Sequence, residues 1–479
     1  MKPSRVASNS VLVLSSEILD RLMRFILAVF AARLLGDADY GKFTFTIAFG
    51  ALFLILADFG VHQLLIREIA RKPDKVETLL GNGLTIKLVL SGFTALCIYV
   101  AAQFTHKPHD VLMTVYVIGA AQITGSFAEY FSTVFQGFQR MKYTAIAALI
   151  LSVSNTVIGV IVLLQGGSFL DLAWVYLVSR FLKLIYCFVV ARAKFARIVL
   201  SFRKPLLKFL VFEGYSFGIT RFFSVMYTNV DTTMLSIMIG DAVVGWYNAA
   251  YRLIFAMMVI PMGIMRAVYP ALSAYFKSQQ EAFDSLFEKT FKLMFLTGTS
   301  IACVLSLFSN RIILLMFGDE FINAAAALRI LVWSTAIYFM GTVMTHAMRA
   351  AGKQRFTAKV VAASAFLNLF LNFIFIPRFS FIGAAFATLT SELFTFSFHF
   401  WYLRRYIVKP PLLRLLPKIV LINAIMVVSI RLLVDFPLLI LIALALAVNL
   451  IMVVFTKYYT KDDLVRIQSM AKVIKFSSS

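Results

Sequence analysis

The sequence predicts an all-α integral membrane protein with about fourteen transmembrane helices, arranged as two pseudo-symmetric six-helix bundles plus two C-terminal helices. Hydrophobic residues make up 61% of its 479 residues and charged residues only 14%, whereas soluble globular chains carry about a quarter charged residues. The mean hydropathy of +0.87 is spread along the whole chain, and so much apolar surface requires lipid as its solvent. A pair of internal repeats supports the division into two bundles.

Apolar stretches of about 20 residues, the length that crosses about 30 Å of hydrocarbon, recur throughout the chain. The predicted spans are 9–35, 40–66, 79–102, 111–136, 143–164, 172–193, 209–238, 244–272, 291–309, 323–349, 357–377, 382–403, 415–434 and 437–457. Only Asp435–Pro437 separates the last two spans.

Basic residues in the loops predict the orientation. They gather in alternate loops, as in Arg67–Lys75 and Arg192–Lys208, while the opposite loops are short and contain few. Lys and Arg mark cytoplasmic loops, so we predict a multi-pass protein of the cell inner (plasma) membrane with both termini cytoplasmic. The net charge of +23 follows from this pattern and predicts no nucleic-acid partner, because such proteins gather basic residues on one soluble face.

Two internal repeats divide the chain into halves. Leu-Gly-Asp-Ala at 35–38 recurs as Ile-Gly-Asp-Ala at 239–242, and Lys-Tyr-Thr-Ala at 142–145 recurs as Arg-Phe-Thr-Ala at 355–358. Equivalent positions lie six helices apart, and an even number gives both halves the same orientation. The predicted domains are an N-terminal bundle at 1–195, a basic cytoplasmic linker at 196–208, a C-terminal bundle at 209–405, two additional transmembrane helices at 406–460 and a cytoplasmic tail at 461–479.

Ionisable residues inside the first predicted span indicate a site. A central Arg or Asp costs roughly 2.5–3.5 kcal/mol on insertion scales, so such side chains should face protein or a water-filled cavity. Glu17, Arg21 and Arg24 share one helical face, and Asp20 precedes Arg24 by one turn. A salt-bridge network that only orients helices is the alternative to a cavity.

The second half places further charges in its first two spans. Arg221 and Asp231 lie in the seventh span, and Arg252 and Arg266 lie fourteen residues apart on one face of the eighth. Both halves therefore carry arginines in the helices where a repeat architecture builds its central site. Arg266 is close enough to the inner interface that extension of its side chain into the headgroups is an equal alternative.

The remaining polar residues at membrane depth are weaker signals. Glu129, Arg180 and Lys183 lie within spans, and Lys87 is a candidate partner for Asp58 or Glu129. The chain contains no Walker A loop, nucleophile elbow, HExxH or paired-cysteine motif. We therefore predict no enzyme, no metal site and no cofactor.

A series of short motifs resembles one known family. The motifs are Ala-Ala-Arg-Leu-Leu-Gly at 31–36, Tyr-Gly at 40–41, Asp-Phe-Gly at 58–60, Arg-Glu-Ile-Ala-Arg at 67–71, Gly-Phe-Gln-Arg-Met-Lys-Tyr at 137–143, Pro-Ala-Leu-Ser at 270–273 and Gly-Lys-Gln at 352–354. In this order they are similar to the polysaccharide-biosynthesis flippases, which translocate O-antigen or exopolysaccharide repeat units. This family belongs to the multidrug/oligosaccharidyl-lipid/polysaccharide exporter superfamily, and the resemblance covers nearly the whole chain.

The resemblance implies a V-shaped pair of bundles around a cationic cavity that moves undecaprenyl-diphosphate-linked oligosaccharide by alternating access. The implied diphosphate and cavity contacts are Arg21, Arg24, Arg221, Arg252 and Arg266. The candidates for proton or sodium coupling are Glu17, Asp20, Asp58 and Asp231. The membrane potential is a further driving force. The implied partners are the lipid-linked oligosaccharide, membrane lipids, and a polysaccharide polymerase with its assembly machinery.

Two other functions stay open, and one substrate is disfavoured. A multidrug/toxin exporter of the same fold would be expected to have an acidic cavity for cationic drugs. A membrane polysaccharide polymerase or glycosyltransferase would be expected to have a large outer loop or a catalytic carboxylate motif. Lipid II flippases carry an arginine in the second helix, and the span 40–66 has none before Arg67, which disfavours lipid II as substrate.

Overall fold

The computed structural model is helical throughout the part of the chain that it describes. It describes the backbone of residues 3–433 and 435–459, and the side chains from residue 15 onward in those ranges, except Ser216 and Thr220. The first helices are α1 (Pro3–Leu54), η1 (Ile55–Ala57), α2 (Val61–Arg71), η2 (Pro73–Lys75), α3 (Val76–Gln103), α4 (His109–Gly137), α5 (Met141–Leu164), α6 (Phe169–Lys194) and α7 (Lys204–Met238). The others are α8 (Asp241–Met257), α9 (Val259–Ser278), α10 (Gln280–Leu307), α11 (Ser309–Phe317), η3 (Asp319–Phe321), α12 (Ala324–Ala350), α13 (Gln354–Tyr406), α14 (Leu412–Leu432) and α15 (Leu438–Phe455). The predicted tail at 461–479 lies outside the described residues.

Eleven stretches among the described residues are long and apolar enough to cross a bilayer. Helices suit this environment because each satisfies its backbone hydrogen bonds internally. Two of these stretches contain a kink, at Gly36 (φ 78°) in α1 and at Ser380 (φ 55°) in α13. The chain is therefore an all-α, multi-pass membrane protein, as predicted, while the number of fourteen spans stays a prediction.

Two predicted spans are interrupted. The span 40–66 breaks at a turn where Phe59 (φ 40°) and Gly60 (φ 85°) adopt left-handed backbone conformations. The Asp58 carboxylate accepts a hydrogen bond from the His62 backbone N–H at 3.2 Å, which satisfies a donor in the first turn of α2. The span 244–272 is divided at Met258 between α8 and α9, three residues before Pro261, whose nitrogen cannot donate to the preceding turn.

Contacts divide the described residues into two compact units. Unit 1 runs to Ala249 and includes Asn372–Phe381, whereas unit 2 contains Ala250–Leu371 and the described residues from Ile382 onward. Unit 1 thus holds α1–α7 and the first half of α8. The predicted domain boundaries at 195, 208 and 405 stay a prediction.

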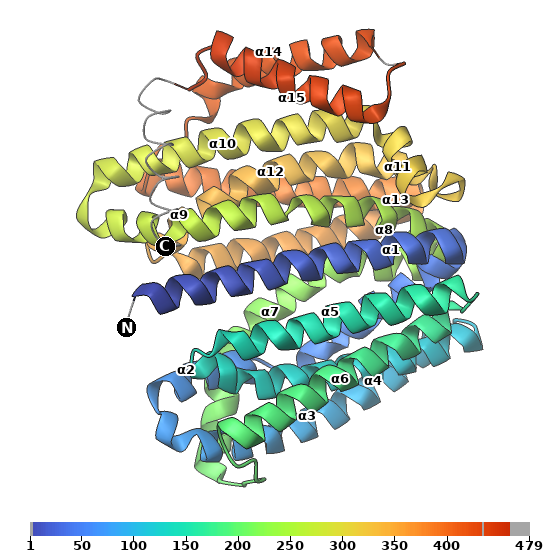
Figure 1. Ribbon diagram of the computed structural model, residues 1–479, viewed down its shortest axis with the longest axis vertical. Helices are drawn as coiled ribbons and strands as arrows, with labels where there is room; N and C mark the ends of the chain where they lie inside the picture. Colours follow the sequence, from blue (N-terminus) through green and yellow to red (C-terminus); the bar gives the residue numbers. More distant parts are fainter. Residues whose placement is uncertain (1–2, 434, 460–479) are drawn as a thin grey trace. The chain divides into compact units, whose positions relative to one another are not determined.

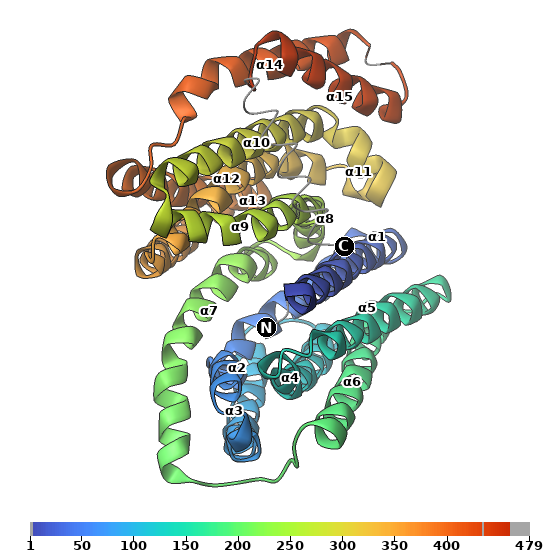
Figure 2. The same cartoon turned by 60° about the vertical axis from the view of Figure 1, so that its left-hand side comes forward.

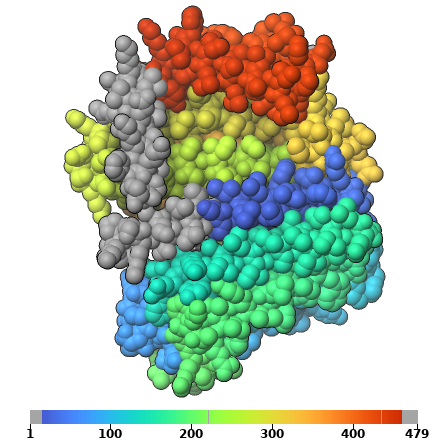
Figure 3. Space-filling view, in the orientation of Figure 1, coloured from blue at the N-terminus to red at the C-terminus, as the bar shows by residue number. Residues whose placement is uncertain are grey.

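In unit 1, α4 packs along α6, and α1 packs along α5 (Figure 1). Figure 3 shows α5 and α6 forming much of one face of this unit, with α1 beside α5. A buried cluster that includes Leu65, Tyr130 and Phe135 fills the space between α2, α3 and α4. Figure 2 shows α7 as a long, bent helix that follows the linker from α6.

Unit 2 has its own core, and polar contacts attach its last two helices. Phe287 and Phe291 of α10 pack in one cluster with Met344 of α12. Asn423 of α14 donates to the Thr299 hydroxyl at 3.2 Å, and Asn449 of α15 donates to Ser300 at 2.9 Å. Such interhelical hydrogen bonds hold helices together where lipid offers no alternative partner.

Candidate functional site

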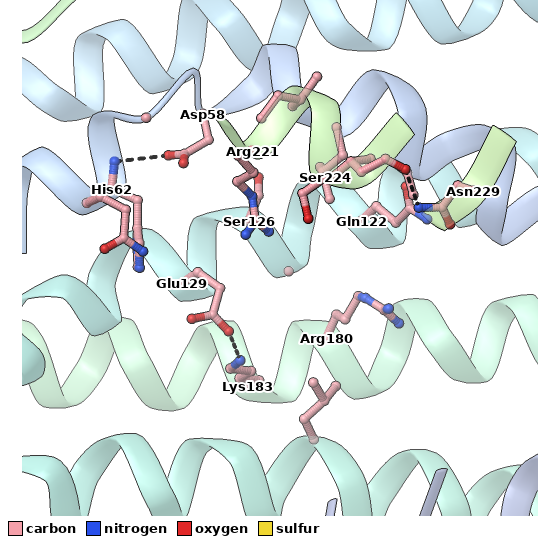
Figure 4. A pocket seen from close by; sticks show the side chains of 18 of the residues that line it. Asp58, His62, Gln122, Ser126, Glu129, Arg180, Lys183, Arg221, Ser224 and Asn229 are labelled. Carbon is pink, nitrogen blue, oxygen red and sulfur yellow. Dashed lines mark hydrogen bonds and ion pairs between the residues drawn. The ribbon is translucent and has the colours of Figure 1, made fainter. Parts of the chain in front are cut away.

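Unit 1 contains a cavity of about 880 Å³ among its helices. Residues from α1, α2, α3, α4, α5, α6 and α7 line it. Figure 4 shows that several ionisable side chains converge on this space. A cavity of this size inside helices that cross a membrane can hold the polar part of a ligand away from lipid.

Basic side chains outnumber acidic ones in the lining. Three lining residues are acidic: Asp20, Asp58 and Glu129. Five are basic: Arg24, Lys87, Arg180, Lys183 and Arg221. The rest of the polar lining is formed by His62, Gln63, Gln122, Ser126, Ser224 and Asn229. The cavity therefore favours an anion.

Two of the basic residues already have strong partners. Lys183 forms an ion pair with Glu129, and its side chain is only 9% accessible. Lys87 is 2% exposed and donates to the Ala57 carbonyl oxygen at 2.8 Å. Among the described residues no ion pair joins Lys87 to Asp58 or Glu129, although the charges of both act on Lys87. The predicted pairing of Lys87 is therefore only an indirect one, because Lys183 of α6 binds Glu129 directly and Asp58 accepts a hydrogen bond from α2.

Arg24 is paired but stays accessible. Its guanidinium forms a hydrogen bond and ion pair with Asp20 one turn earlier in α1, yet 61% of the Arg24 side chain is accessible. Asp20 is the more buried partner, at 13%. An incoming anion can therefore reach Arg24 without first separating it from Asp20.

Arg180 and Arg221 have no carboxylate within ion-pair distance among the residues that the structure describes. Arg180 lies over the ring of Tyr176, with 4.7 Å between the guanidinium carbon and the ring centroid. Arg221 is exposed at the position where α7 lines the cavity. The charge of Arg221 acts on both Lys87 and Glu129, which line the same cavity. Arg180 and Arg221 are the arginines of the lining that have no ion pair among the described residues.

Glycines bring α7 into close contact with the Asp58–Gly60 turn, at residues of α7 that precede its cavity-lining residue Arg221. A Cβ atom on Gly60 would overlap the Gly214 carbonyl oxygen and lie 2.7 Å from the Gly218 nitrogen. We call this the turn contact (Gly60 with Gly214 and Gly218). It places the Asp58–Gly60 turn directly against the backbone of α7, one turn before Arg221.

A second glycine contact lies beyond the cavity-lining part of α7, where residues at and next to the repeat 35–38 touch those at and next to its counterpart 239–242. A Cβ atom on Gly41 would overlap the Asp241 carbonyl oxygen, and one on Gly245 would overlap the Asp37 carbonyl oxygen. We call this the repeat contact (Gly41 with Asp241, Gly245 with Asp37). Equivalent residues of the two halves therefore touch reciprocally.

The charged groups at the repeat contact are all partnered. Lys107 donates to the Asp241 carboxylate at 2.7 Å and to the Ser236 carbonyl oxygen at 2.9 Å. The Trp246 indole N–H donates to the Asp37 carboxylate at 2.8 Å. The contact is thus closed both sterically and electrostatically.

A family model described as polysaccharide biosynthesis protein matches residues 6–276, which is more than half of the chain. The chain belongs to this family. It is a flippase family of the multidrug/oligosaccharidyl-lipid/polysaccharide exporter superfamily, as the sequence resemblance predicted. A second model, described as MatE, matches residues 217–374.

Curated relatives and solved structures extend over most of the chain. The "Probable low-salt glycan biosynthesis flippase" of Haloferax volcanii is 23% identical over 407 residues, which is 84% of either chain. The "Capsular polysaccharide biosynthesis protein" of Staphylococcus aureus is 20% identical and covers 81% of this chain and 97% of its own. The lipid II flippase MurJ in an inward closed conformation superposes with a TM-score of 0.76 at 14% identity, covering 93% of this chain and 99% of that chain. At such identity the structural likeness establishes the fold alone.

The structure places the predicted site residues of this family member, apart from Asp231, in three groups. Those that line the cavity are Asp20, Arg24, Asp58 and Arg221. Glu17 and Arg21 lie on α1 but are not among the lining residues. Arg252 and Arg266 belong to unit 2.

Asp231 is a buried structural centre within unit 1. Its carboxylate accepts hydrogen bonds from the Tyr247 hydroxyl at 2.7 Å and from the Asn372 amide at 2.6 Å. Asn372 lies in the short part of α13 that belongs to unit 1. The predicted roles of Asp231 and of the other candidates in binding or ion coupling stay predictions.

Sequence reasoning left four lining residues out of the site, although it noted their depth in the membrane: Lys87, Glu129, Arg180 and Lys183. The available signal was helical spacing, because Arg180 and Lys183 are three residues apart and therefore lie on the same face of α6. No group of three or more His, Cys, Asp or Glu side chains suited to a metal ion occurs in the described part of the chain.

Proposed function

We propose that this protein translocates undecaprenyl-diphosphate-linked oligosaccharide repeat units from the cytoplasmic to the outer leaflet of the inner membrane. The cavity of unit 1 would receive the diphosphate and the first sugars, while the prenyl chain stays in lipid. Membership of a flippase family supports transport rather than catalysis. The relatives in Haloferax and Staphylococcus, a glycan biosynthesis flippase and a capsular polysaccharide biosynthesis protein by name, support a saccharide cargo.

The observation that carries the proposal is the accessible guanidinium of Arg221, which has no ion pair among the described residues and lines a cavity with more basic than acidic residues. A diphosphate loses its hydration when it enters such a space, so the cavity must replace water with cations. Arginine suits this role because its planar fork donates two parallel hydrogen bonds to phosphate oxygens. Arg24 is the second accessible guanidinium, and Asp20 keeps it positioned.

Neutral polar groups in the cavity suit sugars. Gln122, Ser126, Ser224 and Asn229 line the same space and offer donors and acceptors to hydroxyl groups. In a membrane that is negative inside, outward movement of an anion is favoured by about 2.3 kcal/mol per charge per 100 mV. The potential therefore supports the proposed direction, and coupling through Glu17, Asp20, Asp58 or Asp231 is a further proposal.

The proposed topology has fourteen spans, with both termini cytoplasmic. The kinks at Gly36 and Ser380 would each divide one long helix into two spans, and α7 would add another. The repeat contact would then lie on the extracytoplasmic side and close it in the state that the structure describes. Alternating access would require this contact to open while Arg252 and Arg266 become further substrate contacts.

A flipping assay with purified protein tests the proposal. Proteoliposomes would contain a fluorescent saccharide linked through diphosphate to a short polyprenol, and a membrane-impermeant quencher would report its leaflet. Arg221→Ala and Arg24→Ala should each slow translocation about tenfold or more, because each removes a charge-assisted hydrogen bond of about 1.5–3 kcal/mol. Arg71→Ala is the matched control, since Arg71 is 64% accessible, pairs with Glu68 and is not among the lining residues. Wild-type rates in both cavity variants would exclude the proposal.

A multidrug/toxin exporter is the second candidate. The MatE model match over 217–374 and the likeness to an inward-facing MATE transporter, with a TM-score of 0.65 at 15% identity, favour it. The basic excess in the cavity argues against organic cations as cargo. Increased drug resistance on overexpression, together with no flipping of lipid-linked saccharide, would support this alternative instead.

A further inference from the structure

Lys183 and Arg180 of α6 both lie next to α4, but only Lys183 has a carboxylate partner there. Lys183 meets the Glu129 carboxylate of α4. Arg180, one turn earlier on α6, meets Gly125, one turn earlier on α4: a Cβ atom there would lie 3.1 Å from Arg180 Cδ and 3.2 Å from Nε. α4 therefore places a carboxylate next to Lys183 (Figure 4) but a glycine, without a side chain, next to Arg180.

Arg180 is held in place without losing its charge. Its guanidinium stacks on Tyr176 at 4.7 Å, and its one hydrogen bond, to the Tyr176 carbonyl oxygen, is long at 3.4 Å. Arg24 of α1 also acts on Arg180, and its charge has the same sign. A guanidinium at membrane depth, with a like charge nearby and no carboxylate within ion-pair distance in the described part of the chain, is unfavourable in an empty site. A bound anion would relieve this.

We infer that Arg180, held between Tyr176 and Gly125, is a further binding site for a phosphate group of the translocated diphosphate, beside Arg24 and Arg221 in the same cavity. The inference rests on the proposed function and narrows it. Stacking on Tyr176 uses the face of the guanidinium, whereas the paired N–H donors that match two phosphate oxygens lie on its edge. The Lys183–Glu129 pair supplies no such donors, because its charges are already satisfied.

Gly125→Asp is the decisive variant, because it keeps Arg180 and neutralises it. The new carboxylate would reproduce next to Arg180 the pairing that Glu129 gives Lys183. Affinity for the labelled polyprenyl-diphosphate saccharide is measured on the full-length protein in nanodiscs, with inorganic pyrophosphate as competitor and a phosphate-free polyprenol saccharide as reference ligand. Gly125→Asp and Arg180→Ala should each weaken binding of the lipid-linked diphosphate and of pyrophosphate about tenfold and leave the phosphate-free ligand unchanged.

Two further variants complete the test. Arg180→Lys should weaken the affinity for the lipid-linked diphosphate about threefold or more, because an ammonium keeps the charge but lacks the two parallel N–H donors of a guanidinium. Lys194→Ala is the matched control on α6: Lys194 also lies over an aromatic ring, that of Tyr143 at 5.1 Å, but it is outside the cavity. It should bind all ligands as the wild type does.

The outcomes separate this inference from the proposed function. Unchanged diphosphate affinity in Arg180→Ala and Gly125→Asp, with loss in Arg221→Ala, overturns the inference alone. Loss in Arg180→Ala but not in Gly125→Asp also overturns it, because Arg180 would then act through packing. Unchanged affinity in all three variants overturns the inference and the proposed function together.

Discussion

The cavity and the repeat contact use the same continuous segment, α7 and the start of α8, in opposite ways. Around Arg221 and Asn229 the segment stands away from the N-terminal helices and borders about 880 Å³ of space. Around Asp241 and Gly245 its backbone touches the backbone of α1 so closely that no Cβ atom fits. Charge follows the same division, because basic residues are in excess at the cavity while Lys107 and Asp241 neutralise each other at the contact.

This difference indicates which parts should move and which should bind. A contact between glycine backbones has few intermediate positions, so it is either closed or separated, as bistable packing generally is. The cavity carries an unbalanced charge that only a ligand completes. We therefore expect substitutions at the repeat contact to change the conformational equilibrium, and substitutions at the cavity to change affinity for anions.

The largest expected effect comes from adding one methyl group to the repeat contact. In Gly41→Ala or Gly245→Ala the new Cβ atom would overlap a carbonyl oxygen that belongs to the opposite repeat. Overpacking against backbone should cost the closed state about 3 kcal/mol, the upper end of the usual range. Hydrogen exchange of the amides in 241–245 should accelerate about a hundredfold, and flipping should stop.

Gly92→Ala is the control for these two variants. Gly92 lies in α3, and a Cβ atom on it would meet nothing within 4 Å. Alanine should stabilise that helix by up to about 1 kcal/mol and leave exchange in 241–245 unchanged. If Gly41→Ala exchanged as slowly as Gly92→Ala, the repeat contact would have no role in holding this end closed.

A smaller effect should follow from removing the ion pair at the same contact. Lys107 and Asp241 are 11% and 16% accessible, so Lys107→Met leaves the Asp241 carboxylate with fewer partners in a mostly dry place. We expect the closed state of the repeat contact to lose about 2 kcal/mol of stability, a value typical of hydrogen bonds to charged groups. Exchange in 236–241 should rise by less than in Gly41→Ala. An equal or larger rise would mean that charge, not glycine packing, closes the contact.

The sequence allowed the membrane fold and the equivalence of the two repeats to be predicted. Apolar length determines a spanning helix almost alone, and the offset between residues 35–38 and 239–242 identified Gly36 and Gly240 as counterparts. That the repeats touch each other was not predictable, because a repeat indicates equivalence and not contact. The turn at Asp58–Gly60 was missed because it interrupts an apolar stretch with a single glycine.

The candidate site was predicted only in part, because its chemistry depends on pairs from distant segments. Whether Arg180 or Lys183 is neutralised depends on which residue of α4 faces each, and Gly125 and Glu129 differ by only one turn. Asp231 looked like an intramembrane charge similar to Asp58. Its partner Asn372 lies 141 residues away, and no spacing rule links them.

A substitution in the cavity should give a smaller effect, and it should strengthen a function, anion binding, instead of weakening a contact. Glu129→Gln removes the partner of Lys183 and adds one positive charge to the lining. Because half of the Glu129 side chain is accessible, water screens this charge, and pyrophosphate affinity should rise only about two- to fivefold. Competition binding in nanodiscs measures it, and exchange in 241–245 serves as the control that should not change. Weaker pyrophosphate binding would show that Glu129 positions Lys183 for the ligand.

The smallest effect is expected at the turn contact, where charge and glycine packing also coexist. Arg67 approaches Glu213 of α7 at 3.6 Å, but it also binds Glu68 at 3.1 Å, and Glu213 is 54% accessible. Exposed ion pairs contribute about 0–1 kcal/mol, so Glu213→Gln should change exchange in 61–65 by no more than about threefold, and 1 M salt should abolish even that. Gly218→Ala provides the contrast, because its Cβ atom would lie 2.9 Å from the Phe59 carbonyl oxygen. A larger effect for Glu213→Gln than for Gly218→Ala would mean that α7 is held here by charge, and that the two glycine contacts differ in kind.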